Sequence, residues 1–119
     1  MTGFPQAVRE LVAGRSGGLC EIRHPASCTG RVEQLHHRTP RGMGGSRHPA
    51  INNAANCLGV CAECHAFVES SREVAMWHGW LVSRYDVSAT RPVLYRSRWV
   101  LLDAAGNVTE VADPQEVTG

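Results

Sequence analysis

Five consecutive residues, Cys61 to His65, combine two kinds of metal ligand at a spacing that could serve two different sites. Cys61 and Cys64 form a C-x-x-C pair, which lets both sulfurs of one turn point at the same ion. Cys20 and Cys28 form a wider pair upstream, and an irregular loop can fold back to bring them together. Four thiolates close a tetrahedral site, so these cysteines predict a structural Zn²⁺ that stabilises the fold.

The other thiol chemistries fit the sequence less well. Cys57 lies in an apolar segment, where we expect a small buried side chain. His24 lies between Cys20 and Cys28 and is an alternative ligand in place of Cys28. A redox C-x-x-C would need a thioredoxin-like βαβ pattern, which is not apparent. No basic segment followed by an apolar run opens the chain, so we expect neither a secretory signal nor a disulfide framework.

A second group of potential ligands contains no cysteine. His36 and His37 are adjacent at the end of an expected strand, so their side chains should point to opposite faces. His65 opens an expected helix, and Glu69 lies one turn later on the same face. A strand, a loop, a second strand and a helix would gather His36, His65 and Glu69 around one divalent ion. His37 would then face away from that ion and do different work.

The elements that must position these residues are short. In chain order the patterns predict a helix over 5–13, an irregular knuckle over 20–28, a strand over 32–37, a glycine-rich loop over 38–53, a strand over 56–60 and a helix over 63–77 with a potential break at Ser70 and Ser71. Further strands are expected over 81–82, 93–95, 99–102 and 108–111, with a turn at 105–107. We expect Trp77, Trp80 and Trp99 to belong to the core.

Composition fits one small soluble domain. The chain has 119 residues, twelve arginines, no lysine and a net charge of +1. Six arginines lie between Arg15 and Arg47, whereas the residues after Arg98 include four acids and no base. Arginine binds phosphate with a planar fork, although a lysine-free chain also fits a GC-rich genome. No stretch approaches the length of a membrane span, so no membrane partner is expected.

The segment from Cys20 to Glu69, under half of the chain, resembles the HNH endonuclease family. It looks most like the small HNH proteins of tailed bacteriophages, which carry two cysteine pairs around the nuclease motif. The matching residues are Leu35-His36-His37, the loop Arg41-Gly42-Met43-Gly44-Gly45, Asn53-Ala54-Ala55-Asn56 and Cys61-Ala62-Glu63-Cys64-His65.

The resemblance implies an α+β fold. Its core would be a ββα-metal (His-Me finger) unit with a four-cysteine zinc knuckle and an N-terminal helix, together forming a nuclease domain over 1–80. Residues 81–119 would form a short β-rich extension packed on the same domain. A bacteriophage origin would place the protein in the cytoplasm of the host cell, where a phage terminase is an expected partner.

The resemblance also implies a role for each site residue. His37 matches the general base that takes a proton from the attacking water, and a pKa of about 6.5 suits that role. His36 and His65 match the ligands of the catalytic metal, and Glu69 falls where some relatives place a further ligand. Asn56 matches the asparagine that holds the loop and helps to orient the base. Mg²⁺, Mn²⁺, Ni²⁺ and Zn²⁺ all remain candidates for the catalytic ion.

Two questions stay open at the level of sequence. The family's asparagine could be Asn52 or Asn53 instead of Asn56, although the spacing to Cys61 favours Asn56. Arg38, Arg41 and Arg47 flank the site and are candidates to contact phosphates of double-stranded DNA, or they belong to a solvated loop. The alternative function is a non-catalytic zinc module that binds DNA or protein, and the retained His37 favours the enzyme.

Overall fold

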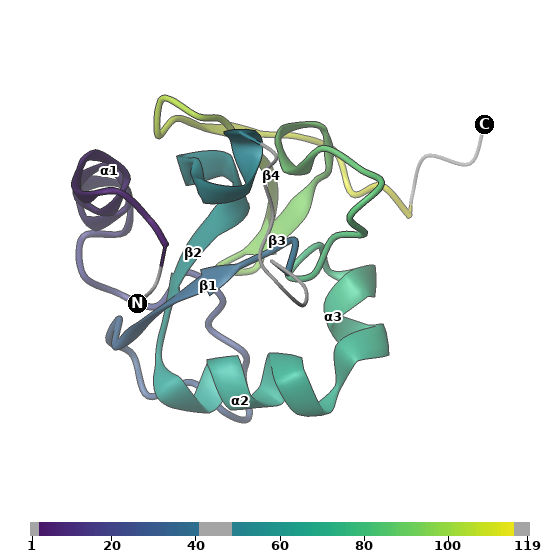
Figure 1. The fold of residues 1–119 in the computed structure, drawn as a ribbon. Coiled ribbons are helices and arrows are strands. Elements are labelled where there is room, and N and C mark those ends of the chain that lie inside the picture. Colours follow the sequence, from purple (N-terminus) through teal and green to yellow (C-terminus); the bar gives the residue numbers. More distant parts are fainter. Residues whose placement is uncertain (1–2, 41–48, 116–119) are drawn as a thin grey trace.

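Two small antiparallel sheets and three α-helices make up the fold in the computed structural model, which describes residues 3–40 and 49–115 (Figure 1). The helices are α1 (Gln6–Ser16), α2 (Ala62–Ser70) and α3 (Arg72–Trp77), with short 3₁₀ helices η1 (Pro49–Asn52), η2 (Ala54–Asn56) and η3 (Ser88–Thr90). The strands are β1 (Gln34–His37), β2 (Cys57–Val60), β3 (Val93–Tyr95), β4 (Arg98–Leu102) and β5 (Val108–Glu110). The predicted α+β class is confirmed.

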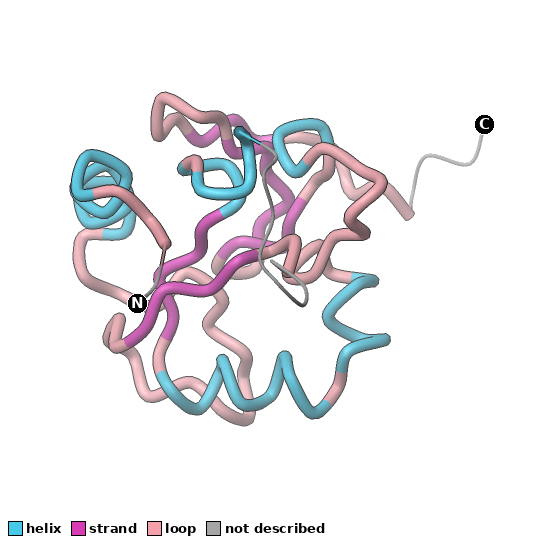
Figure 2. Tube along the Cα trace, in the orientation of Figure 1, coloured by secondary structure: helices cyan, strands magenta, loops and turns pink. Residues whose placement is uncertain are grey.

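The hairpin of β1 and β2 lies between α1 and α2 (Figures 1 and 2). Its register pairs Gln34 with Val60 and His37 with Cys57. All four residues of β2 are buried, because α1 packs on this strand and the core covers it. Along β1, Gln34 is exposed, Leu35 is half-buried, His36 is buried and His37 is half-buried. Successive side chains of a strand point to opposite faces, so the two histidines lie on different faces.

Helix α2 begins immediately after β2. Cys61 is its N-cap, and the Cys61 sulfur accepts a hydrogen bond from the Cys64 backbone N–H at 3.3 Å. α2 ends at Ser70, and Ser71 breaks the helix with φ −129° and ψ 57° before α3 starts at Arg72. The predicted break at this serine pair is confirmed.

The second sheet has the order β3-β4-β5. Its first hairpin turns through Arg96 and Ser97, which both have positive φ. The predicted strand over 81–82 is wrong. The backbone N–H of Leu81 bonds to Ala75 O at 3.2 Å, and that of Val82 bonds to Arg38 O at 2.8 Å. These two donors therefore serve loop contacts instead of a strand ladder.

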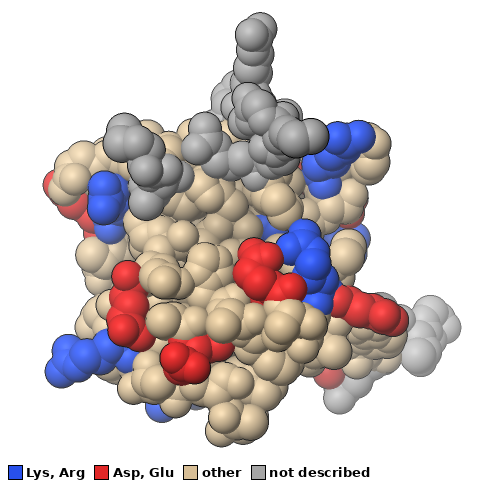
Figure 3. All heavy atoms as spheres, turned by 60° about the horizontal axis from the view of Figure 1, so that its bottom comes forward, with Lys and Arg blue, Asp and Glu red and all other residues tan. Residues whose placement is uncertain are grey.

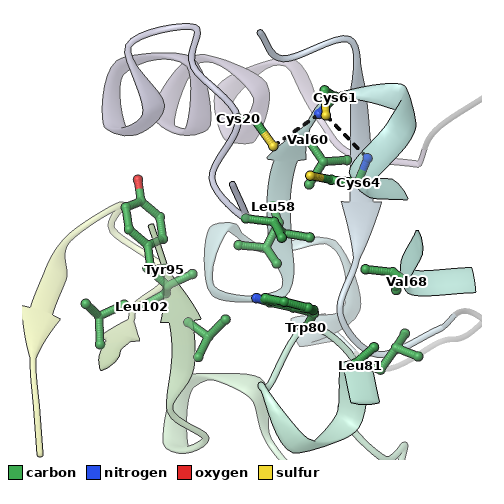
Figure 4. Packing of buried hydrophobic residues seen from close by; sticks show 14 residues of the cluster. Cys20, Leu58, Val60, Cys61, Cys64, Val68, Trp80, Leu81, Tyr95 and Leu102 are labelled. Atoms are coloured by element: carbon green, nitrogen blue, oxygen red, sulfur yellow. Dashed lines mark hydrogen bonds between the residues drawn. The ribbon is translucent and has the colours of Figure 1, made fainter. Parts of the chain in front are cut away.

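One core cluster joins the two sheets. Trp80 is its largest side chain, and its Nε1 donates to Leu94 O at 2.7 Å. Leu58 from β2 and Leu102 from β4 belong to the same cluster (Figure 4). Trp77, in contrast, is 63% exposed, so the prediction that it lies in the core is wrong. Within the described ranges, the helices are too short or too polar to cross a membrane.

A buried ion pair ties α1 to the rest of the molecule. Arg15 Nε lies 2.7 Å from Glu21 Oε2, and both side chains are almost fully buried. Glu21 also accepts hydrogen bonds from the Tyr95 hydroxyl at 2.6 Å and the Gly59 N–H at 2.8 Å. Arg15 donates to Cys57 O at 2.6 Å. Buried charges need such partners, and no local sequence pattern marks this network.

Candidate metal centres

Four cysteines converge at the start of α2. The sulfurs of Cys20, Cys28, Cys61 and Cys64 all lie within 4.8 Å of one another, and Cys61 Sγ is 3.9 Å from Cys28 Sγ. Zinc–sulfur bonds of about 2.3 Å place the sulfurs of a tetrahedral site about 3.8 Å apart. The cluster could therefore hold a metal ion, and its ligand set and spacing are consistent with zinc.

A narrow loop brings the first cysteine pair to the second. The cysteine knuckle, residues 20–28, is closed at its base by a bond from the Cys20 N–H to Gly30 O at 3.0 Å. Backbone donors point at the sulfurs: Cys61 N lies 3.3 Å from Cys20 Sγ (Figure 4). In addition, Thr29 N lies 3.4 Å from Cys61 Sγ. N–H groups aimed at sulfur favour the thiolate, which is the form that binds metal.

The thiols differ in their acidity. Burial acts to raise the pKa of Cys61, but hydrogen bonds donated by Thr29 and Cys64 outweigh it and lower the pKa to about 6. Burial raises the pKa of Cys28 and of Cys64. One thiolate is therefore present at neutral pH, and a bound cation would favour ionisation of the others.

The remaining candidates for thiol-site ligands lie elsewhere. Cys57 is buried outside the cluster, and burial raises its pKa to about 12, which confirms the prediction of a small buried side chain. His24 stacks on Phe67 with ring centroids 4.0 Å apart. Its Nδ1 accepts from the Ala26 N–H at 3.2 Å. The four-ligand group in the described residues is thus the four cysteines, without His24.

A second group of ligands is formed by β1 and α2. One ligand atom from each of His36, His65 and Glu69 lies within 4.8 Å of the other two. The rings of His36 and His65 have centroids 5.1 Å apart. His36 is 3% exposed, His65 is half-buried and Glu69 is exposed. An ion held there would therefore be open to solvent on the Glu69 side, as a catalytic ion must be.

Hydrogen bonds assign the nitrogen that each imidazole offers. His36 Nε2 donates to Trp80 O at 2.7 Å, so Nδ1 carries the lone pair. His65 Nδ1 donates to Gln34 Oε1 at 2.5 Å, so Nε2 carries the lone pair. Such outer hydrogen bonds commonly orient metal-binding histidines. Burial lowers the pKa of His36 to about 4, so this ligand is neutral at pH 7, as metal binding requires.

Glu69 already has a cationic neighbour. Its Oε2 lies 2.8 Å from Arg72 Nη1, and both side chains are more than half exposed. An exposed pair of this kind stabilises a protein by about 0–1 kcal/mol. Glu69 is therefore held near the two histidines by an interaction weak enough for a metal ion to replace.

His37 occupies the opposite face of β1. Its Nε2 donates to Asn52 Oδ1 at 2.8 Å, which makes Nδ1 the nitrogen with the lone pair. The ring stacks on Phe4 at a centroid distance of 4.0 Å and an interplanar angle of 17°. The imidazole thus has a defined orientation and tautomer. Asn52 is the residue that sequence reasoning set aside in favour of Asn56.

Asn56 holds the loop instead. It is 2% exposed, and its Oδ1 accepts from the Thr39 N–H at 2.8 Å and from the Ser88 hydroxyl at 2.5 Å. Its Nδ2 donates to Ile51 O at 2.8 Å. Asn56 therefore joins the two ends of the segment between Thr39 and Ile51, and it acts as a positioning residue.

The structure corrects the prediction that Arg38 contacts DNA. Arg38 is fully buried, and its guanidinium donates to the carbonyls of Gly79, Ala55, Ser88 and Arg91 at 2.9, 2.9, 3.1 and 2.9 Å. Buried carbonyls need donors, and Arg38 supplies them here, although Ser88 O also accepts from the Arg91 N–H at 3.1 Å. The other two predicted DNA contacts, Arg41 and Arg47, lie outside the described residues.

Comparisons with protein-family models, curated proteins and solved structures find no match to this chain.

Proposed function

We propose that this protein is a metal-dependent HNH endonuclease that hydrolyses phosphodiester bonds in double-stranded DNA. The hairpin of β1 and β2 followed by α2 is the order of elements that a ββα-metal core requires. His36 and His65 come from the first strand and the helix of this unit, and Glu69 follows one helical turn later. These residues and their arrangement are what supports assignment to the HNH endonucleases.

The observation that carries the proposal is the division of labour between two adjacent histidines. His36 lies in the three-ligand group, whereas His37 is turned away and held by Asn52 and Phe4. A purely structural metal site has no use for a second oriented imidazole beside it. A hydrolase needs both a metal site and a base of suitable pKa close by.

The chain's own residues can perform the proton transfer. His37 would take a proton from water at Nδ1, while its Nε2–H bond to Asn52 keeps the ring in place and stabilises the imidazolium. A divalent ion held by His36, His65 and Glu69 would polarise the scissile phosphate and stabilise the leaving 3′ oxygen. Two imidazoles with one carboxylate suit Mn²⁺, Ni²⁺ or Zn²⁺, and Mg²⁺ is the further candidate.

The four-cysteine cluster would hold a structural zinc in this proposal, next to the catalytic ligands on the same helix. The resemblance to phage HNH proteins extends the proposal to DNA packaging with a terminase in the cytoplasm of a host cell. A non-catalytic zinc module with the same fold would keep the cysteine cluster and bind DNA without cleaving it.

Plasmid nicking tests the proposal. Supercoiled plasmid is incubated with the purified protein and Mg²⁺, Mn²⁺, Ni²⁺ or Zn²⁺ in turn, and the wild type is compared with His37→Ala. Loss of a general base should lower the cleavage rate by about 10²–10⁴-fold. His78→Ala is the control, since it removes an imidazole that lies outside both ligand groups and whose ring centroid is 4.6 Å from that of Trp80 and 6.4 Å from that of Trp99. Equal cleavage by the wild type and His37→Ala would refute the role of His37.

A further inference from the structure

A groove of about 470 Å³ lies between the cysteine knuckle and the β3–β4 hairpin. Three arginines line it: Arg23 from the knuckle, Arg96 from the hairpin turn and Arg98 from the start of β4. Tyr95 and Glu110 are also part of its lining. We call this surface the arginine groove, and none of the site residues described above belongs to it.

The backbone around the arginine groove adopts a costly conformation. In the described part of the chain, the non-glycine residues with positive φ are Arg23, Arg96 and Ser97, at 54°, 50° and 69°. Two of these three line the groove, and the third connects Arg96 to Arg98. Left-handed backbone is unfavourable for residues with a Cβ atom, and hairpin turns of this type usually contain asparagine and glycine. Such outliers concentrate at functional sites.

Arg96 is fixed in place by the end of α1 and the knuckle. Its Nη2 donates to Ser16 O at 2.6 Å and to Leu19 O, and its Nε donates to Cys20 O at 3.2 Å. The guanidinium carbon lies 5.2 Å from the centroid of the Tyr95 ring. Arg96 is half-buried, whereas Arg23 and Arg98 are exposed. One cation held by hydrogen bonds and two exposed cations thus share the groove.

The groove carries an excess of positive charge. Three guanidinium groups face one carboxylate, that of Glu110. Among the described residues, ion pairs within 4.0 Å join Arg15 to Glu21 and Arg72 to Glu69, and neither pair includes a groove arginine. Figure 3 brings forward the side of the molecule on which α2 lies, and basic and acidic side chains are interspersed there. The arginine groove is therefore a local concentration of charge on a chain whose net charge is only +1.

We propose that the arginine groove binds backbone phosphates of nucleic acid. Guanidinium forks match the geometry of phosphate oxygens, and several together bind a phosphate that none would hold alone. Contacts of this kind position a duplex without reading its bases. The choice of DNA as the source of the phosphates rests on the proposed nuclease function.

The proposal gives the cysteine knuckle a second role. Arg23 belongs to the knuckle, and Arg96 is anchored on the Cys20 carbonyl, next to a metal-binding sulfur. A metal ion bound by the four cysteines would therefore fix the arginine groove as well as the start of α2. DNA binding and the catalytic ligands would depend on the same knuckle.

Fluorescence anisotropy with a short labelled DNA duplex tests this proposal, with the intact protein and no added divalent ion. Arg23→Ala and Arg98→Ala are compared with Arg9→Ala and Arg84→Ala, two exposed arginines elsewhere. Each groove variant should bind several-fold more weakly, and its salt slope of log K between about 50 and 200 mM should fall in magnitude by about 0.9 per lost contact. The control variants should keep the wild-type slope. A thermal melt of each variant verifies folding.

Two results would overturn the proposal. One is an equal loss of affinity in the control and groove variants, and the other is a wild-type slope in Arg23→Ala and Arg98→Ala. Titration with inorganic phosphate distinguishes a site for a free anion from a site for the phosphates of a nucleic acid. Binding of inorganic phosphate that needs Arg23 and Arg98, with unchanged DNA affinity, would assign the groove to a free anion and reject nucleic acid.

The outcome is independent of cleavage. Weaker DNA binding by the groove variants, combined with a wild type that never nicks plasmid, would support the groove and refute the nuclease. If the wild type nicks plasmid and the groove variants bind DNA as tightly as the wild type, the nuclease would be supported and the groove refuted.

Discussion

Arg38 offers a sharp test, because the sequence predicts a contact with phosphate, whereas the structure buries the side chain. The side chain is fully buried and donates to the carbonyls of Gly79, Ala55, Ser88 and Arg91. Arg38→Met keeps much of the volume but removes every donor. Ser88 O keeps a second donor, the Arg91 N–H at 3.1 Å. A buried group left without its partner costs about 1–3 kcal/mol, so the other three carbonyls at the lower bound amount to about 3 kcal/mol. That is a large share of the usual 5–15 kcal/mol of total stability.

Urea unfolding measures this loss directly. Arg38→Met should lower the free energy of unfolding by about 3 kcal/mol or more, whereas exposed Arg9→Met should change it by less than about 0.5 kcal/mol. Arg38→Lys should fall between the wild type and Arg38→Met, since an ammonium supplies three donors without the fork. An Arg38→Met protein within about 1 kcal/mol of the wild type, but with weaker DNA binding, would refute the structural role and restore the phosphate contact.

Three further predictions concern the two ligand groups and the orientation of His37. Glu69→Gln should weaken Mn²⁺ binding about tenfold or more in isothermal titration. Arg72→Ala, which breaks the same ion pair but keeps the carboxylate, should bind Mn²⁺ at least as tightly as the wild type. Because the pKa of Cys61 is lowered to about 6, its thiolate persists at neutral pH and is lost as the pH falls through about 6. In the metal-free protein the ultraviolet absorbance of the thiolate should fall over that range, and Cys61→Ser should remove this step; an absorbance that stays unchanged between about pH 7 and about pH 5 would contradict the assignment. Asn52→Ala should slow plasmid nicking through His37 while Mn²⁺ affinity stays unchanged, and a matching loss of Mn²⁺ affinity would instead indicate disruption of the fold.

Local patterns were sufficient to predict most of the elements. The C-x-x-C pair at Cys61 and the alternation around His36 are short-range signals, and the structure places both as expected. The predicted strand over 81–82 failed because tertiary contacts decided it. Arg38 O and Ala75 O take up the donors that a strand would have used. Apolar pairs such as Leu81-Val82 fit a loop packed on the core as well as they fit a strand.

Buried polar residues were the main limit of sequence reasoning. No local pattern marks Arg15, Glu21 and Arg38 as buried, because burial of a charge depends on partners far away in the chain. Glu21 meets the Tyr95 hydroxyl, and Arg38 meets Arg91 O, across more than fifty residues in each case. The sequence left open whether Asn52 or Asn56 contacts His37 for the same reason, because this contact depends on the folded loop. Both asparagines serve the site, but only the folded loop shows which of them contacts His37.

The first turn of α2 joins the two candidate ligand groups, and in the proposed nuclease this link would give the cysteine site a role. α2 has nine residues, and isolated helices shorter than about 12–15 residues are marginal in water. Cys61 caps the helix and Cys64 lies in its first turn, so a metal ion bound there would hold the turn that carries His65. In the three-ligand group, His65 of α2 lies close to His36 of β1, and a frayed first turn would let His65 move away. Zinc bound by the cysteines would therefore act on catalysis through the position of His65, without taking part in the reaction.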